Sequence, residues 1–156
     1  MEFPQDLCIG DILLYHGKSF FNIVTDLKTG GQSDHVEIYA GDGQTVASRP
    51  EGFNVFPFKE QGLIKVRRPQ VEFWKDAADV WLEPLKGMKY DAIGLFQFFN
   101  LDWSNNSFIC SVGAAHYLKA GRCVMFADDY PLAKISPRDF ELTTQALTVW
   151  KKPFPI

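Results

Sequence analysis

Cys110 is the residue of this chain best suited to nucleophilic chemistry. It lies in the segment 104–121, where a polar run precedes a helix-like stretch that closes at Gly121. Ser107 or a neighbouring Asn is expected to cap this helix, and Gly121 to form its left-handed C-terminal cap. Cys110 then falls in the first turn, where unpaired backbone N–H groups and the helix dipole favour a thiolate over a thiol. The alternative is that Cys110 is a small buried apolar residue, as most free cysteines are.

A catalytic thiol also needs a base, and His35 is the best candidate. It lies in the segment 34–39, DHVEIY, whose alternation is typical of a strand, so His35, Glu37 and Tyr39 share one face. An imidazole held next to a thiol at a helix start takes the thiol proton and later protonates the leaving group. The alternative is that His35 is only a polar residue at a strand end, because distance in sequence says nothing about adjacency.

The other histidines are weaker candidates. His16 stands beside Gly17 at the end of an expected strand and is expected at the surface. His116 follows Cys110 by six residues, which is roughly 240° around a helix, so it points elsewhere. The histidines and cysteines show no HxxxH or CxxC spacing, so we expect no metal site and no cofactor.

Length and composition restrict the class of protein. We expect 156 residues to form one domain, 1–156, and the net charge of -3 argues against a nucleic-acid partner. The short basic run 65–68 is expected to be a solvated strand face. Three cysteines without a CxxC pair fit a reducing compartment. The N-terminus lacks the features of a signal peptide, and no apolar run is as long as a membrane span. We therefore expect a cytoplasmic or virus-borne protein without an integral membrane segment.

Strands are expected mostly before helices, which predicts an α+β domain. A Gly41-Asp42-Gly43 turn between two of the strands predicts a β-hairpin. Ser136-Pro137 is a strong helix start. The aromatic segment 96–103 is expected to pack in the core or to form the wall of a substrate groove. The expected strands are 10–15, 34–40, 45–48, 53–58, 63–68 and 146–150, the expected helices are 71–85, 90–99 and 108–120, and residues 20–27 are expected to form a helix or a lid.

Several of these segments together resemble the circularly permuted branch of the NlpC/P60 superfamily. In this papain-like fold the histidine half precedes the cysteine half. The matching segments are GDILL at 10–14, DHVEIYAGDG at 34–43, GMKYD at 87–91, FICS at 108–111 and ISPRDF at 135–140. They span nearly the whole chain in the family's order. The resemblance implies a permuted papain-like fold, with an antiparallel sheet or barrel packed against the helix that bears the cysteine.

The resemblance also implies roles for single residues. Cys110 would be the nucleophile and His35 the general base, and Tyr90 would help a backbone N–H at Cys110 to bind the oxyanion. The family usually places a polar residue that orients the base about twelve positions after it, but this chain has Ala47 there. The neighbouring Ser48 would lie opposite His35 after a small change of register.

Glu37 stands where the family usually has a small residue. It is expected to orient His35, to meet a substrate amine at the mouth of the site, or to lie on a solvated strand face. If neither Glu37 nor Ser48 reaches the imidazole, a backbone group or water takes that place and catalysis is slower.

Three functions follow from the resemblance. The first is a cysteine amidase or peptidase that cleaves an amide bond in a cell-wall peptide stem or in an N-acylated small molecule. The second is a lipid-directed acyltransferase or thioesterase that uses the same two residues on an ester. The third is a catalytically inactive binding module, which the departure at Ala47 suggests. The expected partner is accordingly a small-molecule, peptide or acyl substrate, and the sequence leaves the oligomeric state open.

Overall fold

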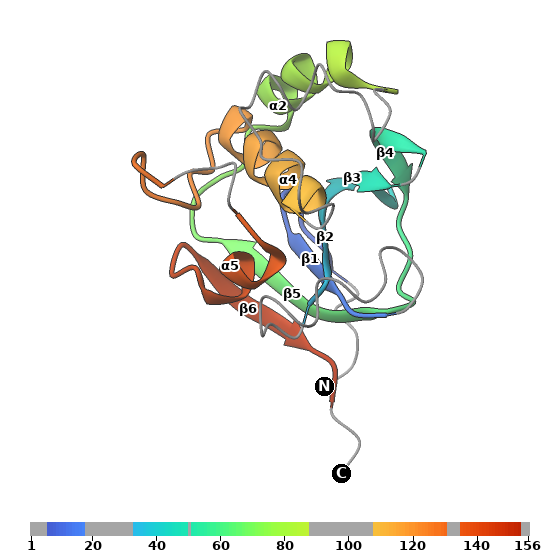
Figure 1. Ribbon diagram of the computed structural model, residues 1–156, viewed down its shortest axis with the longest axis vertical. Coiled ribbons are helices and arrows are strands. Elements are labelled where there is room, and N and C mark those ends of the chain that lie inside the picture. The colour runs from blue at the N-terminus through green and yellow to red at the C-terminus, as the bar shows by residue number, and fades with distance from the viewer. Residues whose placement is uncertain (1–5, 18–32, 50, 88–107, 131–134, 154–156) are drawn as a thin grey trace.

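The computed structural model describes residues 6–17, 33–49, 51–87, 108–130 and 135–153 (Figure 1). Within these residues the chain has an α+β fold, as predicted, with a six-stranded antiparallel sheet in the order β4-β3-β2-β1-β5-β6. The strands are β1 (Ile12–Tyr15), β2 (His35–Gly41), β3 (Gln44–Arg49), β4 (Gly52–Pro57), β5 (Leu63–Pro69) and β6 (Ala146–Lys151). The helices are α2 (Lys75–Leu82), α4 (Phe108–Ala120) and α5 (Pro137–Leu142), and a 3-10 turn, η1 (Glu83–Leu85), follows α2.

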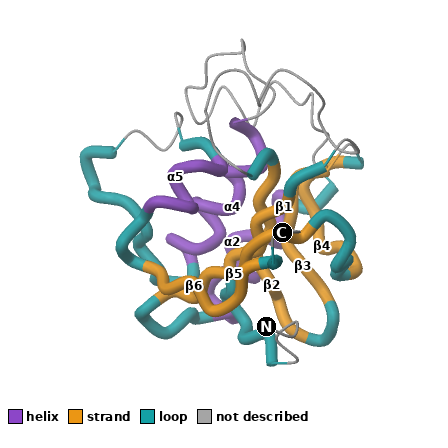
Figure 2. Tube along the Cα trace, turned by 90° about the horizontal axis from the view of Figure 1, so that it is seen from below, coloured by secondary structure: helices purple, strands orange, loops and turns teal. Residues whose placement is uncertain are grey.

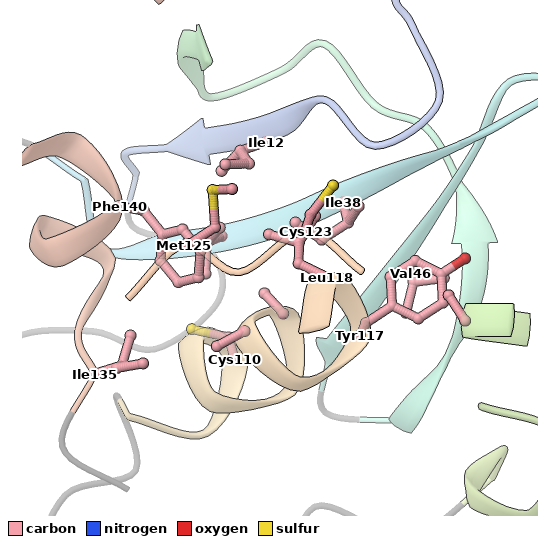
Figure 3. Packing of buried hydrophobic residues seen from close by; sticks show 14 of the residues in the cluster. Ile12, Ile38, Val46, Cys110, Tyr117, Leu118, Cys123, Met125, Ile135 and Phe140 are labelled. Carbon is pink, nitrogen blue, oxygen red and sulfur yellow. The ribbon is translucent and has the colours of Figure 1, made fainter. Parts of the chain in front are cut away.

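The helices α2, α4 and α5 gather on one side of the sheet (Figure 2). Helix α4 packs against β2 and β3 and also touches α2 and α5. The main core lies between α4 and the sheet, because alternate strand residues turn their apolar side chains toward the helix. Its sheet members include Ile12, Leu14, Val36, Ile38 and Val46, and its helix members include Cys110, Ala114, Tyr117 and Leu118. Figure 3 shows how Cys110, Tyr117 and Leu118 of the helix pack against the sheet.

The opposite face of the sheet has an apolar cluster of its own. Leu13 and Tyr15 of β1 pack there with Leu63, Val66 and Trp150. Since Ile12 and Leu14 face α4 while Leu13 and Tyr15 face this second cluster, every residue of β1 is buried. This explains why β1 is a continuous apolar run in the sequence.

The predicted hairpin forms between β2 and β3. Its turn residues Gly41, Asp42 and Gly43 all have positive φ, at 91°, 51° and 69°. Glycine takes such angles without strain, and aspartate tolerates them better than most residues. The turn sets a register in which Ile38 is across from Val46 and Tyr39 is across from Thr45. The register shifts between Tyr39 and Gly41. On the far side of this shift from the turn, residues of odd number on the two strands share one face of the sheet.

The end of α4 differs in detail from the prediction. The helix ends at Ala120 before Gly121, as expected, but the residue with left-handed backbone is Arg122, at φ 65°. Gly121 is needed for a different reason. A Cβ atom at Gly121 would lie 2.1 Å from a carbon of the Phe73 ring, so only glycine fits under that ring. The glycine was predicted correctly as the helix end, and its role as the left-handed cap was wrong.

Two further predictions need correction. The helix expected over 71–85 is shorter, because α2 begins at Lys75 and only its 3-10 extension reaches Leu85. The basic run 65–68 is not a solvated face. Arg67 is only 7% exposed, and it donates hydrogen bonds to the carbonyl oxygens of Phe140 and Glu141 at the end of α5.

The start of α5 matches its prediction. Pro137 is the first helical residue, and the backbone N–H of Ser136 donates to Oδ2 of Asp139 at 2.7 Å. The predicted elements 20–27 and 90–99, the aromatic segment 96–103 and the cap at Ser107 lie outside the described residues. In the part of the chain that the structure describes, no helix has the length and apolar character needed to cross a membrane.

Candidate active site

Cys110 is placed at the start of α4, in the first turn of the helix, as predicted (Figure 3). Its side chain is buried, with 2% of its surface exposed. It belongs to the core cluster that also holds Met125, Ile135 and Phe140. The hydroxyl of the next residue, Ser111, donates to the carbonyl oxygen of Ile135 at 2.5 Å. This bond holds the first turn of α4 against the segment that leads into α5.

His35 is the first residue of β2, and its imidazole is also buried, with 2% of its surface exposed. Its Nε2 atom lies 2.9 Å from Oε1 of Glu37, two residues along the same strand. The ring of Tyr15, which is across from His35 on β1, lies beside the imidazole at a centroid distance of 5.9 Å. The carboxylate and the aromatic ring together fix the plane of the imidazole.

Glu37 is bound by side chains from two strands. Arg49 donates from Nε to Oε1 at 2.8 Å and from Nη2 to Oε2 at 2.9 Å, and Thr45 donates its hydroxyl to Oε2 at 2.7 Å. Burial acts to raise the pKa of Glu37, but the hydrogen bonds and positive charges of His35 and Arg49 outweigh it and lower the pKa to about 2. Glu37 is therefore a buried carboxylate, and the solvated strand face among its predicted alternatives is wrong.

His35 and Cys110 interact, although 75 positions separate them in the sequence. Burial alone acts to lower the pKa of His35. The negative charge of Cys110, a hydrogen bond with its side chain, and the contacts with Glu37 outweigh burial and raise this pKa to about 10. Glu37 occupies Nε2, so we expect a proton exchanged with the sulfur to be carried by the other ring nitrogen, Nδ1. Glu37, His35 and Cys110 thus form a buried series in which each side chain contacts the next.

The register of the hairpin explains which residue holds the imidazole. Continued from the pair Ile38 and Val46, it places Ala47 across from Glu37 and Arg49 across from His35. Ser48 lies on the other face of β3, together with Val46. Glu37 is the residue that contacts Nε2 of His35, and orienting His35 was one of the roles predicted for it.

Arg49 was not predicted from the sequence as a site residue. The sequence did contain a hint of its role. Arg49 follows Thr45 by four residues on the same strand, so strand alternation places both side chains on the face that carries Glu37. Only a fixed register shows that it is also close enough to bind the carboxylate. Tyr90, the predicted oxyanion residue, lies outside the described residues.

The remaining histidines and cysteines lie elsewhere. His116 stacks on Trp81 of α2 at a centroid distance of 6.2 Å, so its ring points away from Cys110, as predicted. Burial and the positive charge of Lys119 lower the pKa of His116 to about 4. His16 is exposed, also as predicted. Cys8 is exposed, whereas Cys123 is buried and burial raises its pKa to about 11.

Within the described ranges, no group of three or more His, Cys, Asp or Glu side chains has a geometry that could hold a metal ion. What the described cluster offers chemically is a thiol, an imidazole and a carboxylate in contact, which is the set needed for nucleophilic acyl transfer. Neither a protein-family model nor a curated protein sequence matches this chain.

Proposed function

We propose that this protein is a cysteine hydrolase with a permuted NlpC/P60-like, papain-like fold, in which Cys110 attacks the carbonyl carbon of an amide bond. The observation that supports this most is the buried contact series from Glu37 through His35 to Cys110. A buried imidazole between a carboxylate and a thiol is uncommon as a packing arrangement, because each polar group must give up water to be there. The same arrangement is what thiol catalysis requires.

In the proposed active state the Cys110 proton already lies on Nδ1 of His35, so that a thiolate faces an imidazolium. The sulfur then attacks the carbonyl carbon, and the carbonyl π electrons move to oxygen to give a tetrahedral oxyanion. When this intermediate collapses, the carbon–nitrogen bond breaks, and His35 gives its proton to the leaving amine. Water attacks the thioester that remains, with His35 as the base, and this restores the thiol and releases the carboxylic acid. Glu37 stays ionised throughout and holds the imidazole in the orientation that each step needs.

The position of Cys110 supports stabilisation of the oxyanion. The first turn of a helix has backbone N–H groups without an intrahelical partner, and the helix dipole adds a partial positive charge there. A donor of this kind lowers the barrier by roughly 3 to 4 kcal/mol in acyl-transfer enzymes. The family resemblance adds the side chain of Tyr90 as a further donor.

Ala47 was the reason to consider an inactive binding module. In this chain Glu37, which lies on β2, the strand that also carries His35, contacts Nε2 of His35. The departure from the family pattern therefore moves the orienting group from one strand of the hairpin to the other. This supports a working site and favours the hydrolase over the binding module.

Alkylation of the purified chain with iodoacetamide tests whether Cys110 is a catalytic thiol. A catalytic thiolate reacts at pH values well below the pKa of about 8.5 of an ordinary thiol. We expect mass spectrometry at pH 6 to show modification of Cys110 ahead of Cys8, even though Cys8 is exposed and Cys110 is buried. Preferential modification of Cys8 at pH 6 would argue for the binding module.

Turnover then tests the substrate class. We expect the wild type to hydrolyse cell-wall peptide fragments or N-acyl amines, and the Cys110→Ala variant to be inactive on them. Hydrolysis of short-chain thioesters without cleavage of any amide would instead support the lipid-directed thioesterase or acyltransferase. An NMR titration of the same variant adds an independent readout, because removing the sulfur removes the charge that raises the pKa of His35, and this pKa must fall.

A further inference from the structure

Arg49 on β3 is buried and contacts residues of both neighbouring strands, β2 and β4. It is 4% exposed, and its fork of donors binds both oxygens of Glu37. Its Nη2 atom also lies 3.4 Å from the carbonyl oxygen of Pro57, and its guanidinium lies over the ring of Phe56 at 4.6 Å. An arginine with so little exposed surface loses most of its hydration, so a compensating interaction must repay that loss.

The buried negative and positive charges of the cluster around Glu37 are equal in number only when Arg49 is included. In the active state proposed above, Glu37 and the Cys110 sulfur carry two negative charges, and His35 carries one positive charge. Tyr15 from β1 also faces this cluster, but burial and the charge of Glu37 raise its pKa far above neutral pH, so it stays uncharged. Thr45 from β3 does not titrate. Among the described side chains that contact Glu37, Arg49 is the one that supplies the second positive charge.

We propose that Arg49 is a positioning residue that neutralises Glu37, so that the charge of His35 is available to hold Cys110 as a thiolate. This inference rests on the proposed function and adds a fourth side chain to it. Without Arg49, two buried anions would share one imidazolium. Repulsion between the two anions would then favour protonation of one of them. A proton on Glu37 would weaken its contact with the imidazole, and a proton on the sulfur would convert the nucleophilic thiolate to a thiol.

The geometry also explains why this residue is an arginine. A guanidinium presents two parallel N–H donors that match the two oxygens of a carboxylate, and it stacks on an aromatic ring. Lysine would supply the charge from a single point and leave one oxygen of Glu37 with Thr45 alone. We therefore expect lysine to preserve the charge balance but to hold the carboxylate less firmly.

The test compares Arg49→Met with Arg49→Lys in the full-length protein. Alkylation of Cys110 by iodoacetamide is followed by mass spectrometry as a function of pH, with the exposed Cys8 as the internal reference. The matched control is Arg67→Met, because Arg67 is also buried and bonded, but to backbone carbonyl oxygens of Phe140 and Glu141. Far-ultraviolet circular dichroism confirms that each variant is folded.

We expect Arg49→Met to move the half-maximal pH for Cys110 alkylation upward by about one unit, because the negative charge of Glu37 is then no longer neutralised and disfavours the thiolate. Arg49→Lys should stay close to the wild type, and Arg67→Met should lose stability without moving this pH. If Arg49→Met does not fold, Arg49→Gln replaces it, since an amide keeps a hydrogen bond to Glu37 without the charge.

An unchanged half-maximal pH in a folded, uncharged Arg49 variant would overturn the inference while leaving the proposed function intact. The same upward shift in Arg67→Met would also overturn it, because the effect would then follow from lost stability. If Cys110 in the wild type titrates like Cys8, the proposed function fails and this inference fails with it.

Discussion

Replacing Glu37 by glutamine tests the buried charge cluster most directly. The substitution keeps the shape of the side chain but removes the charge that Arg49 and His35 both face. It also replaces one acceptor oxygen by an NH2 group, so that a donor meets the donors of Arg49 or Thr45. Glu37 is 2% exposed, so water cannot repair the lost contacts.

The size of the effect follows from the number and kind of these contacts. Glu37 is bound by three side chains, and a hydrogen bond to a charged group contributes about 1.5 to 3 kcal/mol. These contributions do not add, because the groups form one network. Removal of one partner from a buried ion pair costs about 3 to 5 kcal/mol, and we expect Glu37→Gln to reduce the free energy of unfolding by that amount. A domain of ordinary stability, about 5 to 15 kcal/mol, would remain folded in most of this range.

Urea unfolding at pH 7, followed by tryptophan fluorescence, measures the loss. Thr45→Val is the first control, because it removes one hydrogen bond from Glu37 and keeps the ion pair, and it should cost about 1 to 3 kcal/mol. Glu83→Gln is the second control. Glu83 pairs with Lys86 on the surface with 71% of its side chain exposed, so its loss should change stability by less than about 1 kcal/mol.

The reasoning is refuted if Glu37→Gln is no more destabilising than Glu83→Gln. A double variant, Glu37→Met with Arg49→Met, gives a second test. It removes the ion pair completely and leaves no uncompensated charge between these two positions, so it should cost less than the sum of the two single variants. Strict additivity would mean that Glu37 and Arg49 do not interact energetically.

Two further predictions concern the pH dependence of stability and the packing of α4. The pKa of Glu37 is lowered from 4.5 to about 2 in the folded protein, so its contribution to stability is complete above pH 4.5 and is lost as the pH falls toward 2. The pKa of His35 is raised from 6.5 to about 10, so its contribution to stability is complete below pH 6.5 and is lost as the pH rises through 10. Urea midpoints across pH should show both losses, with the acid loss reduced in Glu37→Gln and the alkaline loss reduced in His35→Gln; equal slopes in variants and wild type would contradict this linkage. Gly121→Ala should destabilise by about 1 to 3 kcal/mol, because the new methyl group meets the Phe73 ring, and Phe73→Leu should recover part of that loss. Wild-type stability of Gly121→Ala in the same urea assay would show that the ring moves aside freely.

The local structure of this protein could largely be predicted from the sequence. The hairpin after β2, the helix that carries Cys110 and the start of α5 at Ser136 all depend on interactions within a few residues of the chain. Glycines and aspartate at a turn, a proline at a first helical position and strand alternation act over that short range. The two residues proposed for catalysis were therefore identified by type and by local position.

The network that surrounds them depended on the tertiary structure. Whether Ser48 or Glu37 holds the imidazole is decided by a hairpin register, because a slip of one residue moves every side chain to the other face. The contact of His35 with Cys110 and the burial of Arg49 depend on how β2, β3 and α4 pack together. A sequence states which groups carry charge, but their interaction energy depends on distance and on the exclusion of water, and both are properties of the folded chain.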